Sequence, residues 1–160
     1  MCSVPHTNAQ LIERFYTAFQ KRDGAGMAAC YASDVKFSDP VFPDLQGARA
    51  GGMWKMLCGR AADLRVEFRD VQATDTGGSA HWDAYYTFTA TGRKVVNRID
   101  ATFKFRDGLI SEHRDVFDFW AWSRQALGPT GLLLGWSPMV KNKVRATAAK
   151  GLDQFMAKNS

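Results

Sequence analysis

The chain has 160 residues, 46% hydrophobic and 12% aromatic, which is enough for one folded core and too little for two independent domains. No run approaches the roughly 20 apolar residues of a membrane span, and the start, Met1 to Ser3, lacks the basic and apolar run of a signal peptide. We therefore expect a cytoplasmic protein without membrane association. The basic residues behind the net charge of +5 are scattered and concentrate only in the C-terminal tail, so nucleic-acid binding is not expected either.

The three cysteines, Cys2, Cys30 and Cys58, form neither an even set nor a CxxC pair. This spacing favours neither a disulfide framework nor a zinc knuckle. Cys30 and Cys58 are expected to be small buried residues, and Cys2 belongs to the N-terminal tail.

The N-terminal third predicts three helices and one short strand. A first helix follows a cap at Thr7 or Asn8, because apolar residues recur at spacings of three and four up to Phe19. A short second helix is expected to include Tyr31 and to end before a strand over 35–38. A third helix is predicted over 48–61, although two glycines weaken its start.

From Leu64 the apolar period changes to two, which indicates a half-buried strand. Three longer runs rich in β-branched and aromatic residues follow, and glycine-containing turns separate them. They predict antiparallel strands over 79–90, 94–106 and 109–119. A short helix over 120–127 and a docked terminal helix that begins at Ser137 and Pro138 complete the chain.

Two stretches carry a family resemblance: residues 37–40 (Phe, Ser, Asp, Pro) after two helices, and residues 107–115 with Asp-Gly before a strand bearing His-Arg-Asp. With the order of elements, they resemble the SnoaL-like branch of the nuclear transport factor 2 superfamily over about residues 8–122. The resemblance implies an α+β fold, a cone-shaped curved antiparallel sheet with three N-terminal helices on its concave face. Residues 1–126 would form this cone, and residues 127–160 would add an apolar loop and a C-terminal helix to the same domain.

One template in this superfamily is ketosteroid isomerase. Asp39, before Pro40, resembles its general base, a role suited to a carboxylate in an apolar pocket. The tyrosine on its first helix would fall on Phe15, beside Tyr16. Its partner acid is suggested by Asp100, but alternation places Asp100 on the solvent side of the sheet. A faithful ketosteroid isomerase is therefore not expected.

The second template is limonene epoxide hydrolase, which implies Asp115 as the base that activates water and Asp83 as the proton donor. Here His81 takes the place of the arginine that bridges the two aspartates, and imidazole lacks the fork geometry of guanidinium. The positions of the water-binding tyrosine and asparagine carry Phe37 and Asp39, so a faithful epoxide hydrolase is not expected either.

Strand alternation separates these aspartates. Asp115 falls on the more apolar face of its strand, where a partly desolvated carboxylate suits proton transfer; the alternative is an ion pair with an arginine. Asp83 shares a face with Tyr85 and by alternation faces solvent, so only the resemblance places it in a pocket. Asp39 is either functional or an ordinary turn residue before proline.

Two His-x-Asp triplets, His81 with Asp83 and His113 with Asp115, could together suit iron or zinc. The resemblance implies no metal and no cofactor. An apolar stretch over 131–136 is expected to be a pocket lid or a dimer contact rather than a membrane-touching loop. The residues expected to line the pocket are Phe15, Phe19, Phe37, Trp54, Tyr85, His113 and Phe117.

Together these features predict an enzyme that binds a small, largely apolar, oxygenated molecule in the cone. Acid and base chemistry of hydrolase, isomerase or cyclase type would need no cofactor, with Asp115, Asp83, His81 and Asp39 as its groups. The alternative is a non-catalytic ligand-binding or dimerisation module of the same fold. The resemblance implies a homodimer.

Overall fold

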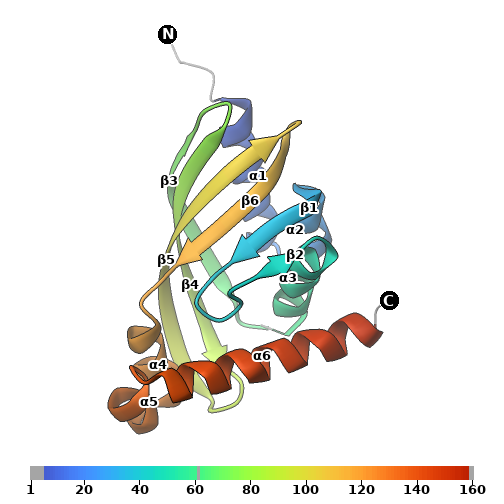
Figure 1. Ribbon diagram of the computed structural model, residues 1–160. Coiled ribbons are helices and arrows are strands. Elements are labelled where there is room, and N and C mark those ends of the chain that lie inside the picture. Colours follow the sequence, from blue (N-terminus) through green and yellow to red (C-terminus); the bar gives the residue numbers. More distant parts are fainter. Residues whose placement is uncertain (1–5, 61, 159–160) are drawn as a thin grey trace.

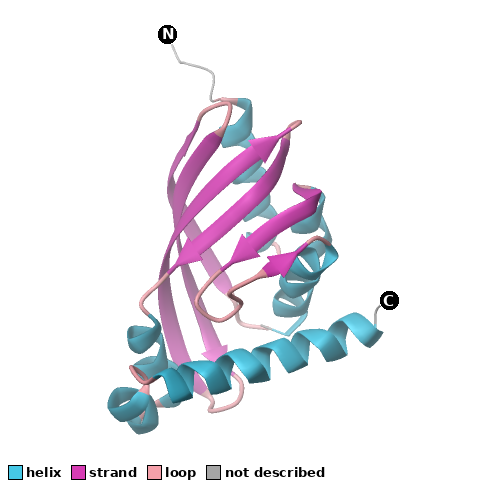
Figure 2. Ribbon diagram, in the orientation of Figure 1, coloured by secondary structure: helices cyan, strands magenta, loops and turns pink. Residues whose placement is uncertain are grey.

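A six-stranded curved sheet wraps around three helices in the computed structural model (Figures 1 and 2), which describes residues 6–60 and 62–158. The strand order is β2-β1-β6-β5-β4-β3. The helices are α1 (Thr7–Gln20), α2 (Gly24–Ala29), α3 (Ala48–Arg60), α4 (Phe119–Leu127), α5 (Pro129–Leu134) and α6 (Pro138–Lys158). The strands are β1 (Tyr31–Ser38), β2 (Leu45–Gln46), β3 (Arg65–Ala73), β4 (Gly77–Phe88), β5 (Arg93–Arg106) and β6 (Leu109–Val116). The predicted α+β class and the N-terminal helices on the concave side are confirmed.

The long strands β3 to β6 pair as an antiparallel meander, as their short glycine turns predict. One pairing differs from the all-antiparallel prediction, because β1 lies parallel to β6. A parallel pair needs a long connection, and here α3 and four strands, β2 to β5, supply it. This pairing places β1, the first strand in the chain, beside β6, the last one.

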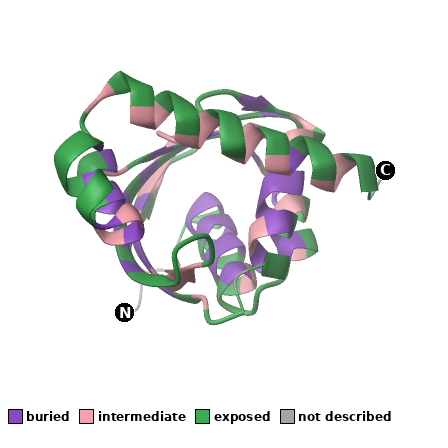
Figure 3. Cartoon of the chain, turned by 90° about the horizontal axis from the view of Figure 1, so that it is seen from below, coloured by how far each residue is buried: buried purple, intermediate pink, exposed green. Residues whose placement is uncertain are grey.

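The inner face of the sheet, meaning the face that α1 and α3 cover, carries the core. Apolar side chains of α1, such as Ile12 and Phe15, are fully buried against it, because their spacing aligns them on one side of the helix. Met53 and Trp54 of α3 close the other side. The burial colours of Figure 3 show these purple helices inside the ring of the sheet.

Three predicted boundaries are wrong. Tyr31 belongs to β1 rather than to the second helix, because Ile110 of β6 donates to the carbonyl of Cys30 and holds the chain in the sheet from there. β6 ends at Val116, since the side chain of Asp118 accepts from Ala121 and caps α4. The stretch over 131–136, expected as a loop, lies mostly in α5. The predicted helix end at residue 61 lies outside the described residues, as does Cys2.

The last helix, α6, runs across the lower end of the molecule from α5 to α3 (Figures 1 and 3). Its C-terminal half docks on α3, where Leu152 is fully buried and Asp153 pairs with Arg49 over 2.7 Å. Its N-terminal half lies by the turn after β1, where Arg145 Nε donates to the carbonyl of Pro40 over 2.8 Å. No helix in the described part of the chain is long and apolar enough to cross a membrane.

Candidate active site

Buried polar side chains gather at one place on the inner face of the sheet. β6 places His113 and Asp115 there together, because residues two apart on a strand share a face. His113 is 1% exposed and Asp115 2%. His113 Nε2 lies 2.8 Å from Asp115 Oδ1. The alternation that predicted an inward Asp115 is confirmed, and its partner is an imidazole rather than the arginine of the alternative prediction.

Tyr31 and Trp54 extend this pair into a chain of hydrogen bonds. Trp54 Nε1 donates to the Tyr31 hydroxyl over 2.7 Å, and that hydroxyl lies 2.7 Å from His113 Nδ1. An indole N–H only donates, so the hydroxyl hydrogen of Tyr31 is left to donate to Nδ1. His113 Nε2–H then donates to Asp115. An imidazole that carries its proton at Nε2 thus uses both ring nitrogens, and the chain of donors ends on Asp115 Oδ1.

Aromatic rings enclose this chain. The His113 ring lies 4.4 Å from the Phe103 ring, 5.1 Å from Phe37 and 5.4 Å from Phe15, measured between centroids, and it stacks on Trp54 at an interplanar angle of 13°. Such close packing leaves few rotamers available. The imidazole is therefore held in one orientation by its hydrogen bonds and its neighbours.

Two oxygen atoms in this region have no hydrogen-bond partner. Among the described residues, the buried side-chain oxygens without one are Tyr16 Oη, Asp115 Oδ2 and Ser123 Oγ, and Ser123 lies apart on α4. Burial, and then the charge of Asp115, raise the pKa of Tyr16 well above its ordinary value. Asp115 Oδ1 is already occupied, since Trp82 Nε1 donates to it over 3.4 Å. One phenol donor and one carboxylate acceptor therefore remain for a bound polar group.

Asp39 lies in the turn after β1, close enough to be affected by the charge of Asp115. Its Oδ1 accepts from the backbone N–H groups of Val41, over 2.7 Å, and Phe42, over 2.5 Å. Burial raises its pKa to about 7; the Phe42 hydrogen bond opposes this, and the Asp115 charge adds to it. Asp39 is thus both a turn residue and a carboxyl group with a pKa near neutral pH. The turn role and a functional role, which the sequence offers as alternatives, are therefore compatible.

His81 and Asp83 do not join this site. The register pairs Asp83 with Arg98 and His81 with Asp100, on the outer face, whereas their neighbour Trp82 reaches Asp115 on the inner face. The expectation that Asp83 and His81 share a pocket with Asp115 is therefore wrong. Alternation along β4 decides the matter, since it turns adjacent residues to opposite faces.

On the outer face, Asp83 is held by a small ion-pair network. Arg69 Nη1 lies 2.9 Å from its Oδ2 and His81 Nε2 2.8 Å from its Oδ1, while His81 Nδ1 lies 2.9 Å from Asp100. Burial opposes the ionisation of Asp83, but the bonds from Arg69 and His81 outweigh it and lower its pKa. Burial likewise disfavours charged His81, and its two aspartates reverse the effect and raise its pKa. Both oxygens of Asp83 are occupied.

The two His-x-Asp triplets lie on opposite faces of the sheet, so they cannot form one ligand set for iron or zinc. Within the described residues, no cluster of three or more histidine, cysteine, aspartate or glutamate side chains is arranged for a metal ion.

The expected pocket residues divide in the same way. Phe15, Phe37 and Trp54 surround His113, and Phe19 packs on Trp54 with ring centroids 5.0 Å apart. Phe117 is partly buried and contacts both this core and a second cluster under α4. The prediction that Tyr85 lines the pocket is wrong. Tyr85 lies on the outer face, where the centre of its ring is 4.1 Å from Cζ of Arg65.

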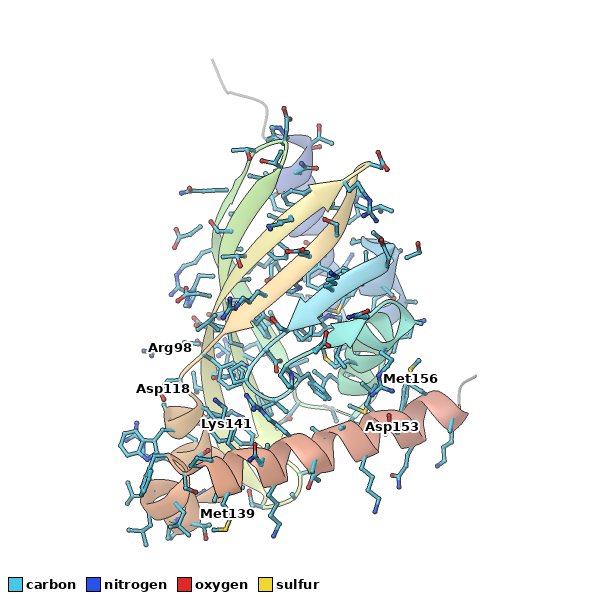
Figure 4. The ribbon with its side chains drawn as sticks, viewed as in Figure 1. Arg98, Asp118, Met139, Lys141, Asp153 and Met156 are labelled. Atoms are coloured by element: carbon cyan, nitrogen blue, oxygen red, sulfur yellow. The ribbon has the colours of Figure 1, made fainter. Side chains whose placement is uncertain are left out.

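Two hollows on the surface of the described part of the chain lie elsewhere. One of about 330 Å³ lies between β5 and α4, and one of about 770 Å³ lies between the ends of α3 and α6. The first is lined by Val96, Asn97, Arg98, Asp118, Ala121 and Gln125, of which Figure 4 labels Arg98 and Asp118. Neither contains Asp115, Tyr16 or Asp39. The interior group carries the acid and base residues, so we take it as the candidate site.

Sequence reasoning missed Tyr31, Tyr16 and Trp82. The helical pattern places Tyr31 in the second helix, and the sequence pattern gives Trp82 no role. The helical spacing Ile12, Tyr16, Phe19 could have placed Tyr16 in the core, where a hydroxyl group needs a partner.

The model of the SnoaL-like domain matches residues 12–113. No curated protein sequence matches the chain. Among solved structures, an LEH-like epoxide hydrolase from M. tuberculosis is 21% identical with a TM-score of 0.63, covering 84% of this chain and 95% of its own.

A provisionally named polyketide cyclase from Pseudomonas putida KT2440 is also 21% identical, with a TM-score of 0.64 and coverage of 76% and 98%. An NTF2-like protein of unknown function from Burkholderia pseudomallei is 20% identical, with a TM-score of 0.61 and coverage of 71% and 92%. At these identities the solved structures show a common fold and leave the reaction open. The family model covers more than half of the chain, which therefore belongs to the SnoaL-like domain family.

Proposed function

We propose that this protein is a cofactor-independent enzyme that moves a proton on a small, largely apolar molecule bearing a carbonyl oxygen. The single observation that carries the proposal is the buried, unpartnered Asp115 Oδ2, in the same interior as the unpartnered Tyr16 hydroxyl, whose pKa the charge of Asp115 helps to raise. A desolvated carboxylate and a phenol donor are the groups that proton abstraction beside a carbonyl requires.

In the proposed step, Asp115 Oδ2 accepts a proton from the carbon next to the carbonyl group. The negative charge moves to the carbonyl oxygen, where the Tyr16 hydroxyl donates a hydrogen bond. His113, fixed by Tyr31, keeps its Nε2–H on Asp115 Oδ1 and so positions the carboxylate. Asp115 Oδ2 then returns the proton to another carbon of the substrate and is ionised again. Asp39, whose pKa is about 7, is a second group that can exchange protons near neutral pH.

This arrangement favours isomerase or cyclase chemistry over epoxide hydrolysis. Epoxide opening of the limonene type would use Asp83 with Asp115 around one water, and Asp83 lies on the outer face with both oxygens occupied. The family membership and neighbours named as cyclases, isomerases or hydrolases are compatible with either reaction.

The competing function is a non-catalytic binding module. It is favoured by the closed interior, in which rings pack against His113 and Asp115 is almost without exposure. Under this alternative, Asp115 and Tyr16 would only bind a polar group of the ligand.

Exchange of solvent deuterium into apolar cyclic ketones, followed by mass spectrometry in D₂O, tests the proposal. Asp115→Asn is expected to slow exchange by at least about 100-fold, the usual contribution of a positioned base. Asp83→Asn is the matched control on the outer face and should leave the rate within about twofold. Equal rates for the wild type and Asp115→Asn would contradict the proposal, and saturable binding without exchange would establish the binding module.

A further inference from the structure

The segment between Asp118 and Asp153 contains no acidic residue and five basic ones. Without these five, 16 basic residues face 16 acidic residues in the rest of the chain. The whole formal charge of +5 therefore resides in α4, α5 and most of α6. Its basic residues are Arg124, Lys141, Lys143, Arg145 and Lys150.

The same segment holds an apolar patch, which we define as Leu132, Leu133, Leu134, Trp136 and Met139. Leu133 is 68% exposed, Trp136 71% and Met139 69%. Figure 4 shows Met139 at the bottom of the molecule, at the start of α6, with Lys141 above it. Exposed apolar side chains that are contiguous in this way mark interaction surfaces.

The exposure of the leucines follows from how α5 packs. Its glycine side faces the protein: Gly131 and Gly135 are buried, and a Cβ on Gly131 would lie 1.8 Å from the carbonyl oxygen of Ser123. The three leucines are therefore turned outward. Trp136 donates its N–H to the carbonyl of Leu133 over 2.8 Å, which leaves an apolar ring at the surface. A helix that covers a core normally turns its apolar side chains toward the protein, whereas α5 turns its leucines toward the solvent.

From this juxtaposition, we infer that the apolar patch and the lysines beside it bind the surface of an anionic lipid bilayer. Leucine, tryptophan and methionine would enter the region between head groups and acyl chains, and Lys141 and Lys143 would contact acidic head groups. The association is peripheral, consistent with the absence of a spanning helix among the described residues. It differs from the sequence-based expectation of a lid or dimer contact.

Charge favours the bilayer over a second copy of the chain. A two-fold symmetric contact would bring the same patch of each copy together, and with it the two segments that carry all the net positive charge. Like charges in apposition disfavour such a contact. An anionic surface matches both the charge and the apolar side chains. The inference does not depend on the proposed reaction, because the patch lies outside the residues matched by the family model.

Flotation of the full chain with vesicles tests the inference, using phosphatidylglycerol mixed with phosphatidylcholine, or phosphatidylcholine alone. We expect binding to the anionic vesicles only, and weaker binding at high salt. The double variant Leu133→Ser with Trp136→Ser should lower the partition at least about tenfold, and so should Lys141→Gln with Lys143→Gln. Lys36→Gln with Lys55→Gln removes equal charge from exposed sites elsewhere and should change it less than twofold.

These side chains are exposed except that of Lys141, which is half-buried with its ammonium 5.6 Å from the centre of the Phe119 ring. The unfolding temperature of each variant is therefore measured beside its vesicle binding, and a variant counts only where that temperature matches the wild type. Absence of vesicle binding, or binding unaffected by the patch variants, would overturn the inference. So would light scattering that shows a wild-type dimer converted to a monomer by the Leu133→Ser and Trp136→Ser pair, because the patch would then belong to a second copy of the chain.

Discussion

Replacing Tyr31 with phenylalanine removes one hydroxyl group from the centre of the buried hydrogen-bond chain. The ring still fits, so the change isolates the polar contribution. Two buried partners lose their bonds: Trp54 Nε1–H and His113 Nδ1. Each unsatisfied buried group costs about 1–3 kcal/mol. We therefore expect Tyr31→Phe to lower the free energy of unfolding by roughly 2–6 kcal/mol, a large part of the ~5–15 kcal/mol of a typical domain.

Urea denaturation monitored by circular dichroism measures this loss, and thermal unfolding should show a fall of about 5–15 °C in the midpoint. Tyr85→Phe is the matched control, because Tyr85 makes one long bond, 3.4 Å to Glu67, on the outer face. It should cost less than about 0.5 kcal/mol. In the double variant Tyr31→Phe with Trp54→Phe, no orphaned N–H remains. The two single losses should therefore exceed the double loss by about 1 kcal/mol.

An equal effect of Tyr31→Phe and Tyr85→Phe would refute the reasoning, since the chain of hydrogen bonds would then contribute nothing to stability. Strict additivity with Trp54→Phe would refute the Trp54–Tyr31 bond alone.

Two further predictions concern the lower end of the molecule. In the fold the pKa of Asp39 is about 7, against an ordinary 3.8, so the native state holds the carboxyl proton more tightly than the unfolded chain does. The stability that this proton contributes is complete below about pH 4 and is lost as the pH rises through about 7. Denaturation at several pH values should thus show Asp39→Asn gaining stability over the wild type between pH 4 and 7, and a constant difference across that range would contradict the assignment. In Gly52→Ala, the new Cβ would lie 2.2 Å from Met156 Sδ, so hydrogen exchange in α6 should become faster. Gly59→Ala, on the same helix with open space around it, should instead stabilise by about 0.4–1 kcal/mol; similar exchange in the two variants would exclude that contact.

The helices and long strands could be predicted because their signals are local. Alternation along β4 and β6 also placed the two best carboxylates correctly: it turned Asp115 inward and Asp83 outward. The resemblance to epoxide hydrolase argued for an inward Asp83, and the structure follows the alternation. A family template assigns a role to a position, whereas the pleat of the strand decides the face.

The hydrogen-bond chain could not be predicted, because it depends on contacts between distant parts of the sequence. Tyr31 meets His113 across 82 positions, through the parallel pairing of β1 with β6. Periodicity has no information about such a register. The outward leucines of α5 were also hidden, since only the close packing of Gly131 on Ser123 determines which side of that helix is buried.

The closed site and the crossing helix are connected by how unevenly α6 is held. Its C-terminal half is fixed by buried Leu152 and by the Asp153–Arg49 pair. Its N-terminal half is held by partly buried Val144, by Lys141 over the Phe119 ring and by the bond from Arg145 to Pro40. Local opening requires least free energy where the fewest apolar contacts are lost. Opening from the N-terminal half would remove a bond to the residue that follows the half-buried Asp39, so we expect water to reach Asp39 before the deeply buried Asp115.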